Sequence, residues 1–256
     1  MSQPATQPAI SLVFPAYNEA ARLPQTFLAL DAWAARLPRS PLEVLFVDDG
    51  SQDETLARCE AYARKRPFAR ALSCAHRGKG FAVRRGMLEA RGEVILFSDV
   101  DLSAPLEEAR HLLAALERGA DLVIGSREVV GSARRDEPLY RHLMGRGFNT
   151  LVQALVVPGV QDTQCGFKLF RRGAAQAIFS RLRRYGEGAP EVEGPLVTAF
   201  DVEVLYVARR LGYRIAEVPV QWTHAEGSKV RPVVDALRMS RDVLAVRWGA
   251  WRGDYD

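Results

Sequence analysis

Two carboxylates that follow an apolar run near the middle of the chain have the types and spacing to bind a cation. The run at 92–97 is rich in β-branched and aromatic residues, as in a buried parallel strand, and it leads to Asp99 and Asp101. Alternate side chains of an extended chain share a face, so Asp99 and Asp101 can converge on one divalent cation. Ligands of open α/β sheets bind at the carboxyl ends of the strands. The alternative is an acidic strand-to-helix turn, with Ser103 and Pro105 opening the next helix.

A second acidic strand end follows the apolar run at 42–47, where Asp48 and Asp49 stand together. Two acidic strand ends in one sheet are unfavourable unless a cation, or donors such as a base N–H and ribose hydroxyls, satisfies them. A nucleotide diphosphate with Mg²⁺ or Mn²⁺ supplies all of these groups. Helix capping explains one of the aspartates but not all four.

Gly78 and Lys79 invite comparison with glycine-rich phosphate loops, but the surrounding residues do not fit. Gly80 replaces the Ser or Thr of a P-loop, and no glycine lies five residues before Gly78. Val83 stands where the third glycine of a dinucleotide-binding fingerprint belongs. Lys79 is therefore either a phosphate contact of another kind of site or a solvated loop lysine.

Strands and helices alternate through the first half of the chain, which is typical of βαβ units and predicts a mostly parallel sheet flanked by helices. Ser51 and Glu54 form a capping-box pattern at the start of one helix. The expected strands are 9–14, 42–47, 69–74, 92–98 and 121–125, and the expected helices are 23–36, 51–66, 80–90 and 105–118.

The second half is less regular. We expect a charged loop at 134–137, a helix at 140–157, a turn and strand at 162–170, a mobile loop at 185–196, a helix at 201–211 and a strand at 213–220. The C-terminal segment predicts an amphipathic helix with Trp248, Trp251 and several arginines. This helix either lies in an anionic membrane surface or packs its apolar stripe on the sheet.

Composition limits the class of protein. The 256 residues are 48% hydrophobic and 26% charged, with a net charge of +4 and a pI of about 9.1, so an anionic partner is expected. Three cysteines without metal-ligand spacing indicate a reduced compartment. The start of the chain is polar and no apolar run reaches the length of a membrane span. We expect a cytoplasmic protein, soluble or peripheral at the inner face of a membrane. The sequence contains no basic stripe with interleaved aromatic residues, so nucleic acid is not expected as a partner.

Several motifs in one order resemble glycosyltransferase family 2, whose members are inverting enzymes of the GT-A fold. The motifs are Pro15-Ala16-Tyr17-Asn18-Glu19, Val47-Asp48-Asp49-Gly50-Ser51, Ser98-Asp99-Val100-Asp101 and Gly125-Ser126-Arg127. Within the family, the segments 162–170 and 222–230 resemble the dolichyl-phosphate β-glucosyltransferases and related polyprenyl-phosphate sugar transferases. The resemblance runs from about Ile10 to Trp251. It implies one GT-A domain, with a nucleotide-sugar half at 9–127, an acceptor half at 128–230 and the C-terminal helix at 231–256.

The resemblance also implies roles for individual side chains. Asp99 would meet ribose, diphosphate or metal, Asp101 would hold the metal, and the segment from His224 to Lys229 would close over the donor. The donor-binding side chains that it implies are Pro15, Tyr17, Glu19, one of Asp48 and Asp49, Lys79, Asp99, Arg127, His224 and Lys229. The sequence assigns no partner to His76, His111 or His142.

The expected activity is transfer of a hexose, glucose by resemblance, from a UDP-sugar to a polyprenyl or dolichyl phosphate with Mg²⁺ or Mn²⁺. Asp162 stands where the family places its base. It orients a phosphate acceptor, deprotonates a hydroxyl acceptor, or merely forms the turn before Thr163. The alternatives are the same donor with a soluble or glycolipid hydroxyl acceptor, and a non-catalytic nucleotide-sugar-binding protein at a membrane surface.

Overall fold

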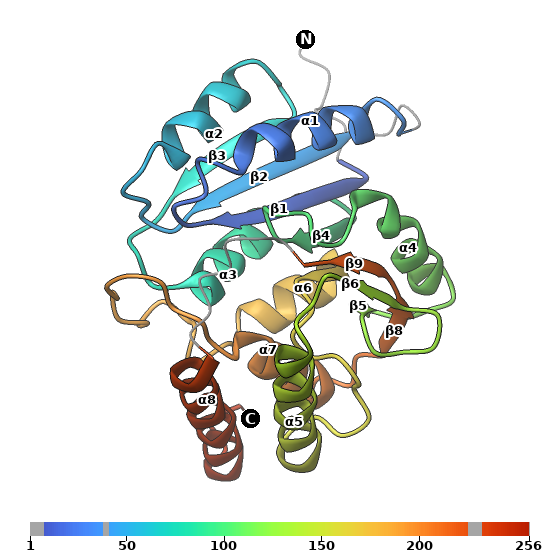
Figure 1. Cartoon of the computed structure of the whole chain (residues 1–256), viewed down its shortest axis with the longest axis vertical. Helices are drawn as coiled ribbons and strands as arrows, with labels where there is room; N and C mark the ends of the chain where they lie inside the picture. The colour runs from blue at the N-terminus through green and yellow to red at the C-terminus, as the bar shows by residue number, and fades with distance from the viewer. Residues whose placement is uncertain (1–7, 38–40, 225–231, 256) are drawn as a thin grey trace.

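The computed structural model describes residues 8–37, 41–224 and 232–255. Its centre is a seven-stranded sheet of order β3-β2-β1-β4-β7-β5-β8 (Figure 1). β7 runs antiparallel to both of its neighbours, whereas the other neighbouring strands are parallel, so the prediction of a mostly parallel sheet is confirmed. The strands are β1 (Ile10–Ala16), β2 (Leu42–Asp48), β3 (Ala69–Ser73), β4 (Val94–Ser98), β5 (Leu122–Ser126), β7 (Phe167–Arg171) and β8 (Ile215–Pro219).

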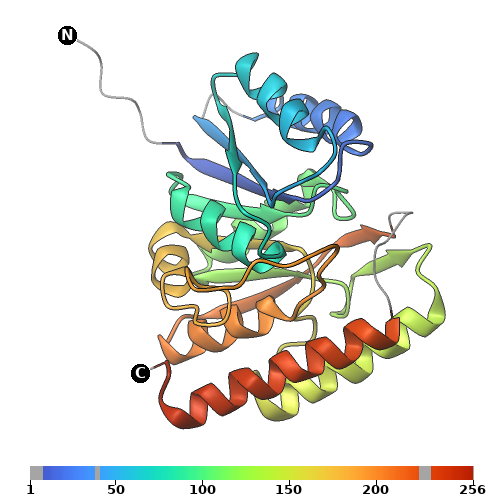
Figure 2. The ribbon, with the colours of Figure 1, turned by 90° about the vertical axis from the view of Figure 1, so that its left-hand side faces the viewer.

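The helices form two groups that pack among themselves. α2, α1, the short 3₁₀ turn η1 and α4 contact one another in that order, and so do α3, α6, α7, α8 and α5. α5 and α8 lie side by side at one end of the molecule (Figures 1 and 2). The bounds are α1 (Leu23–Ala34), α2 (Thr55–Arg64), α3 (Lys79–Glu89), η1 (Leu106–Glu108), α4 (Ala109–Glu117), α5 (Leu139–Leu155), α6 (Arg172–Phe179), α7 (Phe200–Arg210) and α8 (Pro232–Arg252).

The apolar runs that predicted strands form the core of the sheet. Every residue of β1 is buried, and β4 is buried from Ile95 onward, which explains why these runs lack polar alternation. α3 crosses this face closely at Gly86, where a Cβ atom would lie 2.3 Å from the Val13 side chain. Because β1 pairs in parallel with both β2 and β4, the carboxyl ends of these three strands reach the same edge of the sheet.

Three local predictions are corrected. The capping box is wrong: Ser51 Oγ accepts the Asn18 N–H, and Asp53 instead accepts the amide of Thr55, where α2 begins. The expected charged loop at 134–137 begins inside β6 (Ala133–Arg135), which pairs in parallel with β9 (Gln221–Thr223). α6 was not predicted, because it has only 8 residues and begins directly after β7. Among the described residues, no helix is long and apolar enough to cross a membrane.

Candidate active site

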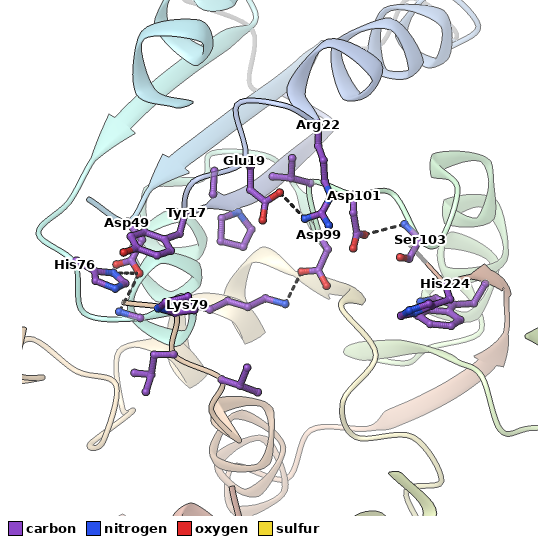
Figure 3. Close-up of a pocket in the computed structure, with 18 residues that line it drawn as sticks. Tyr17, Glu19, Arg22, Asp49, His76, Lys79, Asp99, Asp101, Ser103 and His224 are labelled. Carbon is purple, nitrogen blue, oxygen red and sulfur yellow. Dashed lines mark hydrogen bonds and ion pairs between the residues drawn. The ribbon is translucent and has the colours of Figure 1, made fainter. Parts of the chain in front are cut away.

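Polar side chains from the ends of β1, β2 and β4 surround a cavity of about 260 Å³ at this edge of the sheet (Figure 3). The start of α3 and the segment 195–197 complete its wall. The residues that line it include Pro15, Tyr17, Glu19, Arg22, Asp49, His76, Lys79, Asp99, Asp101, Ser103, Trp222 and His224.

Asp49 shapes one end of this cavity. Its carboxylate accepts the backbone N–H groups of Arg77 and Gly78 and lies 2.8 Å from His76 Nδ1. The His76 ring stacks on Tyr17, with ring centroids 3.9 Å apart and planes 3° apart (Figure 3). Burial raises the pKa of Asp49 despite these hydrogen bonds. The arrangement offers a flat aromatic pair next to a desolvated carboxylate, which suits a nucleobase.

Asp99 and Asp101 stand at the other end of the cavity and differ in their partners. Asp99 pairs with Lys79 Nζ at 2.5 Å. Burial and the neighbouring Asp101 charge raise the pKa of Asp99, although Lys79 opposes them. Asp101 is exposed to the cavity and accepts the Ser103 N–H at 3.0 Å. Within the described ranges, no cation pairs with Asp101.

This pair of carboxylates fits a divalent cation. Hard carboxylate oxygens are the ligands that Mg²⁺ and Mn²⁺ prefer. No group of three His, Cys, Asp or Glu that could hold a metal occurs among the described residues. Mg²⁺ is held in many phosphoryl-transfer enzymes by one or two carboxylates together with substrate phosphates. The only ammonium that pairs with Asp99 or Asp101 in the described structure is that of Lys79. One negative charge therefore remains, which a bound cation would neutralise.

The segment 162–168 builds the floor beneath Asp99, because β7 pairs with β4. The carbonyl of Gly166 accepts the Asp99 N–H at 3.1 Å, and a Cβ atom at position 166 would lie 2.1 Å from Asp99 Oδ2. Lys168, 1% exposed, donates to Asp201 at 2.5 Å and to the Cys165 carbonyl. Glycine at 166 thus leaves room for the Asp99 carboxylate, and Lys168 supplies a buried positive charge nearby.

A second cavity of about 390 Å³ adjoins the first, and Lys79 and Asp99 line both. Arg127 lies in its wall and donates two side-chain hydrogen bonds, of 2.7 and 2.8 Å, to the two carboxylate oxygens of Asp162. The Arg127 backbone N–H is a third donor to this carboxylate. Burial alone would raise the pKa of Asp162, but the Arg127 guanidinium holds it at about 2. Asp162 is therefore a persistent anion that fixes the position of Arg127.

Every carboxylate that lines this second cavity in the described part of the chain is paired with a cation. These pairs are Asp99 with Lys79, Asp162 with Arg127, Glu128 and Glu137 with Arg134, Asp201 with Lys168, and Asp235 with Arg238. None of them is left as a free base.

Comparison with known proteins identifies the family. Residues 11–179 match the family model "Glycosyl transferase family 2". The chain belongs to glycosyltransferase family 2. This confirms the resemblance that the motifs predicted.

Curated relatives of this glycosyltransferase align with nearly the whole chain. It is 38% identical to the dolichyl-phosphate beta-glucosyltransferase of Drosophila melanogaster, over 95% of this chain and 77% of that protein. It is also 38% identical to the Homo sapiens dolichyl-phosphate beta-glucosyltransferase, over the same shares of the two chains.

A solved structure shares the fold. Glucosyl-3-phosphoglycerate synthase from Mycobacterium tuberculosis, in complex with Mn²⁺, UDP-glucose and phosphoglyceric acid, superposes with a TM-score of 0.65 at 25% identity. The match covers 96% of this chain and 81% of that one. Another structure of the same synthase contains Mg²⁺ and UDP. The fold of the present glycosyltransferase is the predicted GT-A fold.

The structure brings most of the sequence-predicted residues of this glycosyltransferase to the two cavities. Asp48 is an exception: it is buried, accepts the Ser51 N–H and lines neither cavity, so Asp49 is the member of the pair that faces the site. Lys229 lies outside the described residues. The predicted mobile loop at 185–196 contacts the site through Gly194, whose carbonyl oxygen lies 2.8 Å from His76 Nε2. The residues at the cavities are Pro15, Tyr17, Glu19, Asp49, Lys79, Asp99, Asp101, Arg127, Asp162 and His224.

Sequence reasoning missed three residues of the site. His76 was left without a partner, although it contacts Tyr17, Asp49 and Gly194. Lys168 and Asp201 form a buried pair that neither segment predicts alone. The sequence offered one signal for this pair. Lys168 lies within a largely apolar strand, and a lysine is rarely buried there without a carboxylate partner.

Proposed function

We propose that this glycosyltransferase transfers glucose from UDP-glucose to a polyprenyl phosphate such as dolichyl phosphate, with inversion at the anomeric carbon. The names of the curated relatives support the acceptor and the sugar. The UDP-glucose and Mn²⁺ in the related synthase structure support the donor and a divalent cation. A lipid acceptor also supports a peripheral position at a membrane.

The observation that carries the proposal is the pairing of every described carboxylate in the second cavity. A hydroxyl acceptor needs a base, and Asp162, with a pKa of about 2 beside Arg127, is a poor one. A phosphate monoester has a second pKa of about 6, so it is already an anionic nucleophile near neutral pH. A cavity whose described carboxylates are all paired with cations suits a phosphate acceptor.

In the proposed mechanism, the two ends of the first cavity bind different parts of the donor. The uracil ring lies near the Tyr17–His76 pair, with Asp49 holding the 76–78 loop in shape. Asp99 and Asp101 would hold the divalent cation, whose chemistry is to stabilise the negative charge of the departing UDP. Lys79, at the boundary of the two cavities, adds a positive charge next to the diphosphate.

The acceptor phosphate enters the second cavity, where Asp162 holds Arg127 in a fixed orientation. Arg127 binds that phosphate and directs one oxygen to the face of the sugar opposite UDP. Attack and departure occur in one displacement, which inverts the anomeric centre. Asp162 acts here as a positioning residue and takes no proton.

The test is UDP release from UDP-glucose with Mn²⁺ or Mg²⁺, measured with and without a short-chain polyprenyl phosphate. We expect release that the lipid phosphate stimulates and EDTA abolishes, together with a glucosylated lipid product. Metal-dependent release that a soluble hydroxyl acceptor stimulates, and lipid phosphate does not, would replace the acceptor. No release with any nucleotide sugar would contradict the proposed activity and favour a binding protein.

A further inference from the structure

Exposed large apolar side chains gather on two helices of the described structure. On α5 they are Leu139 (71% exposed), Tyr140, Leu143 (61%) and Met144. On α8 they are Val234, Leu237 (65%), Leu244, Trp248 (59%) and Trp251 (73%). We call these nine side chains the α5–α8 face. Elsewhere in the described residues, exposed large apolar side chains such as Leu28 and Val130 stand alone.

α8 presents apolar residues on two opposite sides. Val243 and Val246 are fully buried and pack in the core. Five exposed apolar residues, at positions 234, 237, 244, 248 and 251, follow one side of the helix at helical spacing, and exposed Arg241 lies among them. The helix therefore packs on the protein and still exposes two tryptophans and two leucines. An apolar stripe of this kind on a monomer marks an interaction surface.

The charge on these helices is of one sign. The sequence of α5 contains no Asp or Glu. The two acidic residues of α8, Asp235 and Asp242, are buried, and Asp242 accepts hydrogen bonds from Arg184 and Tyr185. The exposed charges of α8 are arginines, among them Arg241 and Arg247. Within the described residues of α5 and α8, the α5–α8 face therefore has exposed arginines and no exposed carboxylate, although Asp136 and Asp254 are exposed just outside the two helices.

This combination matches an anionic lipid surface better than a second copy of the chain. A symmetric dimer through this face would bring arginines against arginines, with no carboxylate from either helix to pair with them. Tryptophan prefers the boundary between lipid headgroups and acyl chains, and arginine is attracted to anionic headgroups. We propose that the α5–α8 face is the membrane-docking surface of this protein and that its partner is an anionic bilayer.

The location of the second cavity agrees with this orientation. Met144 and Phe148 of α5 and Ala236 and Met239 of α8 line it, together with Asp99 and Asp162. The cavity therefore extends from the two helices of the docking surface to the carboxylates of the site. A lipid phosphate whose chain stays in the bilayer would enter between the same helices. This step rests on the proposed function, whereas the docking surface itself does not.

The test is flotation of the purified protein with vesicles of phosphatidylcholine alone and with one quarter phosphatidylglycerol. We expect binding that the anionic lipid strengthens. The variants Trp248→Ser/Trp251→Ser and Leu139→Ser/Leu143→Ser should each weaken binding at least about 10-fold, because each removes two exposed apolar anchors. The matched control is Leu28→Ser/Val130→Ser, which changes exposed apolar residues outside the face and should bind like wild type.

The arginines give a second, independent measurement. Arg241→Gln/Arg247→Gln should lose roughly 5-fold per arginine on anionic vesicles and little on neutral ones. Arg36→Gln/Arg64→Gln, which changes two exposed arginines near α1 and α2, is the control. An equal loss of binding to anionic vesicles in Arg241→Gln/Arg247→Gln and in the control variant would overturn the proposal.

Failure of the docking surface and failure of the proposed function give different results. Wild type that glucosylates lipid phosphate in detergent but never floats would overturn the docking surface alone. Wild type that floats through the α5–α8 face without transfer activity would overturn the proposed function alone. Loss of a dimer in the tryptophan variant by light scattering, with no flotation of wild type, would make the face a contact between copies.

Discussion

The two adjoining cavities handle negative charge in opposite ways. In the first cavity, Asp101 has no cation partner in the described structure and accepts only the Ser103 N–H. In the second, each described carboxylate is paired, and Arg127 holds the pKa of Asp162 at about 2. The first cavity therefore contains a carboxylate without a cation partner among the described residues, whereas each described carboxylate of the second cavity contacts a cation. In the proposed function, this difference assigns the external metal to the first cavity and the acceptor phosphate to the second.

The largest expected effect comes from removing the unpaired charge. Asp101→Asn should lower the rate of transfer by about 10²–10³-fold, because it removes a ligand of the ion that stabilises the departing diphosphate. The measurement is UDP release at saturating Mn²⁺, together with Mn²⁺ affinity followed by calorimetry in the presence of UDP. Glu89→Gln, which breaks only a surface pair with Arg85, is the control and should leave both unchanged. Wild-type metal affinity in Asp101→Asn would contradict the assignment of the metal to the first cavity.

Removing the Lys168 ammonium, which pairs with Asp201 in the wall of the second cavity, should lower the stability of the fold. Lys168→Met should lower the free energy of unfolding by about 3–5 kcal/mol, because it leaves Asp201 buried without its ammonium partner. Urea denaturation gives the value. The double variant Lys168→Met/Asp201→Leu should recover most of the loss, since it removes both charges. Equal destabilisation in the single and double variants would show that packing, and not the charge, is responsible.

The floor of the first cavity provides a steric test. Gly166→Ala places a methyl group against the Asp99 carboxylate and should lower the transfer rate about 10-fold or more through misplacement of that ligand. Gly173→Ala is the matched control, because nothing lies within 4 Å of its added methyl. We expect the control to keep its activity and to gain up to about 1 kcal/mol in stability. Full activity in Gly166→Ala would show that the position of Asp99 is not critical.

The smallest effect is the acid dependence of stability. The pKa of Asp162 is about 2 in the folded protein against an ordinary value of 3.8, so its contribution is present above pH 4 and is lost as pH falls through 2. The difference in unfolding free energy between wild type and Asp162→Asn should therefore shrink by about 2 kcal/mol between pH 5 and pH 2. Comparing the two proteins cancels the opposite effect of Asp49, Asp99 and Asp201, whose pKa values are raised. A constant difference would mean that Arg127 does not stabilise the Asp162 anion.

The sequence alone predicts the first cavity better than the second. Apolar runs located β1, β2 and β4, and residues at the carboxyl ends of neighbouring parallel strands necessarily meet. The second cavity depends on β7 entering the sheet antiparallel between β4 and β5, which no local pattern encodes. That step brings Gly166 to Asp99 and Asp162 to Arg127, 35 residues away. His76 was missed for the same reason, since one of its partners, Gly194, is 118 residues away.

The most direct test of the account is the pH dependence of transfer to a polyprenyl phosphate by wild type and Asp162→Asn. The account predicts that wild type gains rate as the acceptor phosphate loses its second proton near pH 6. Asp162→Asn should be about 10-fold slower, through loss of the Arg127 orientation, and should keep the same rise at the same pH. Loss of that rise in Asp162→Asn, or its shift to the pKa of another group, would show that Asp162 removes a proton from the acceptor and would contradict the account.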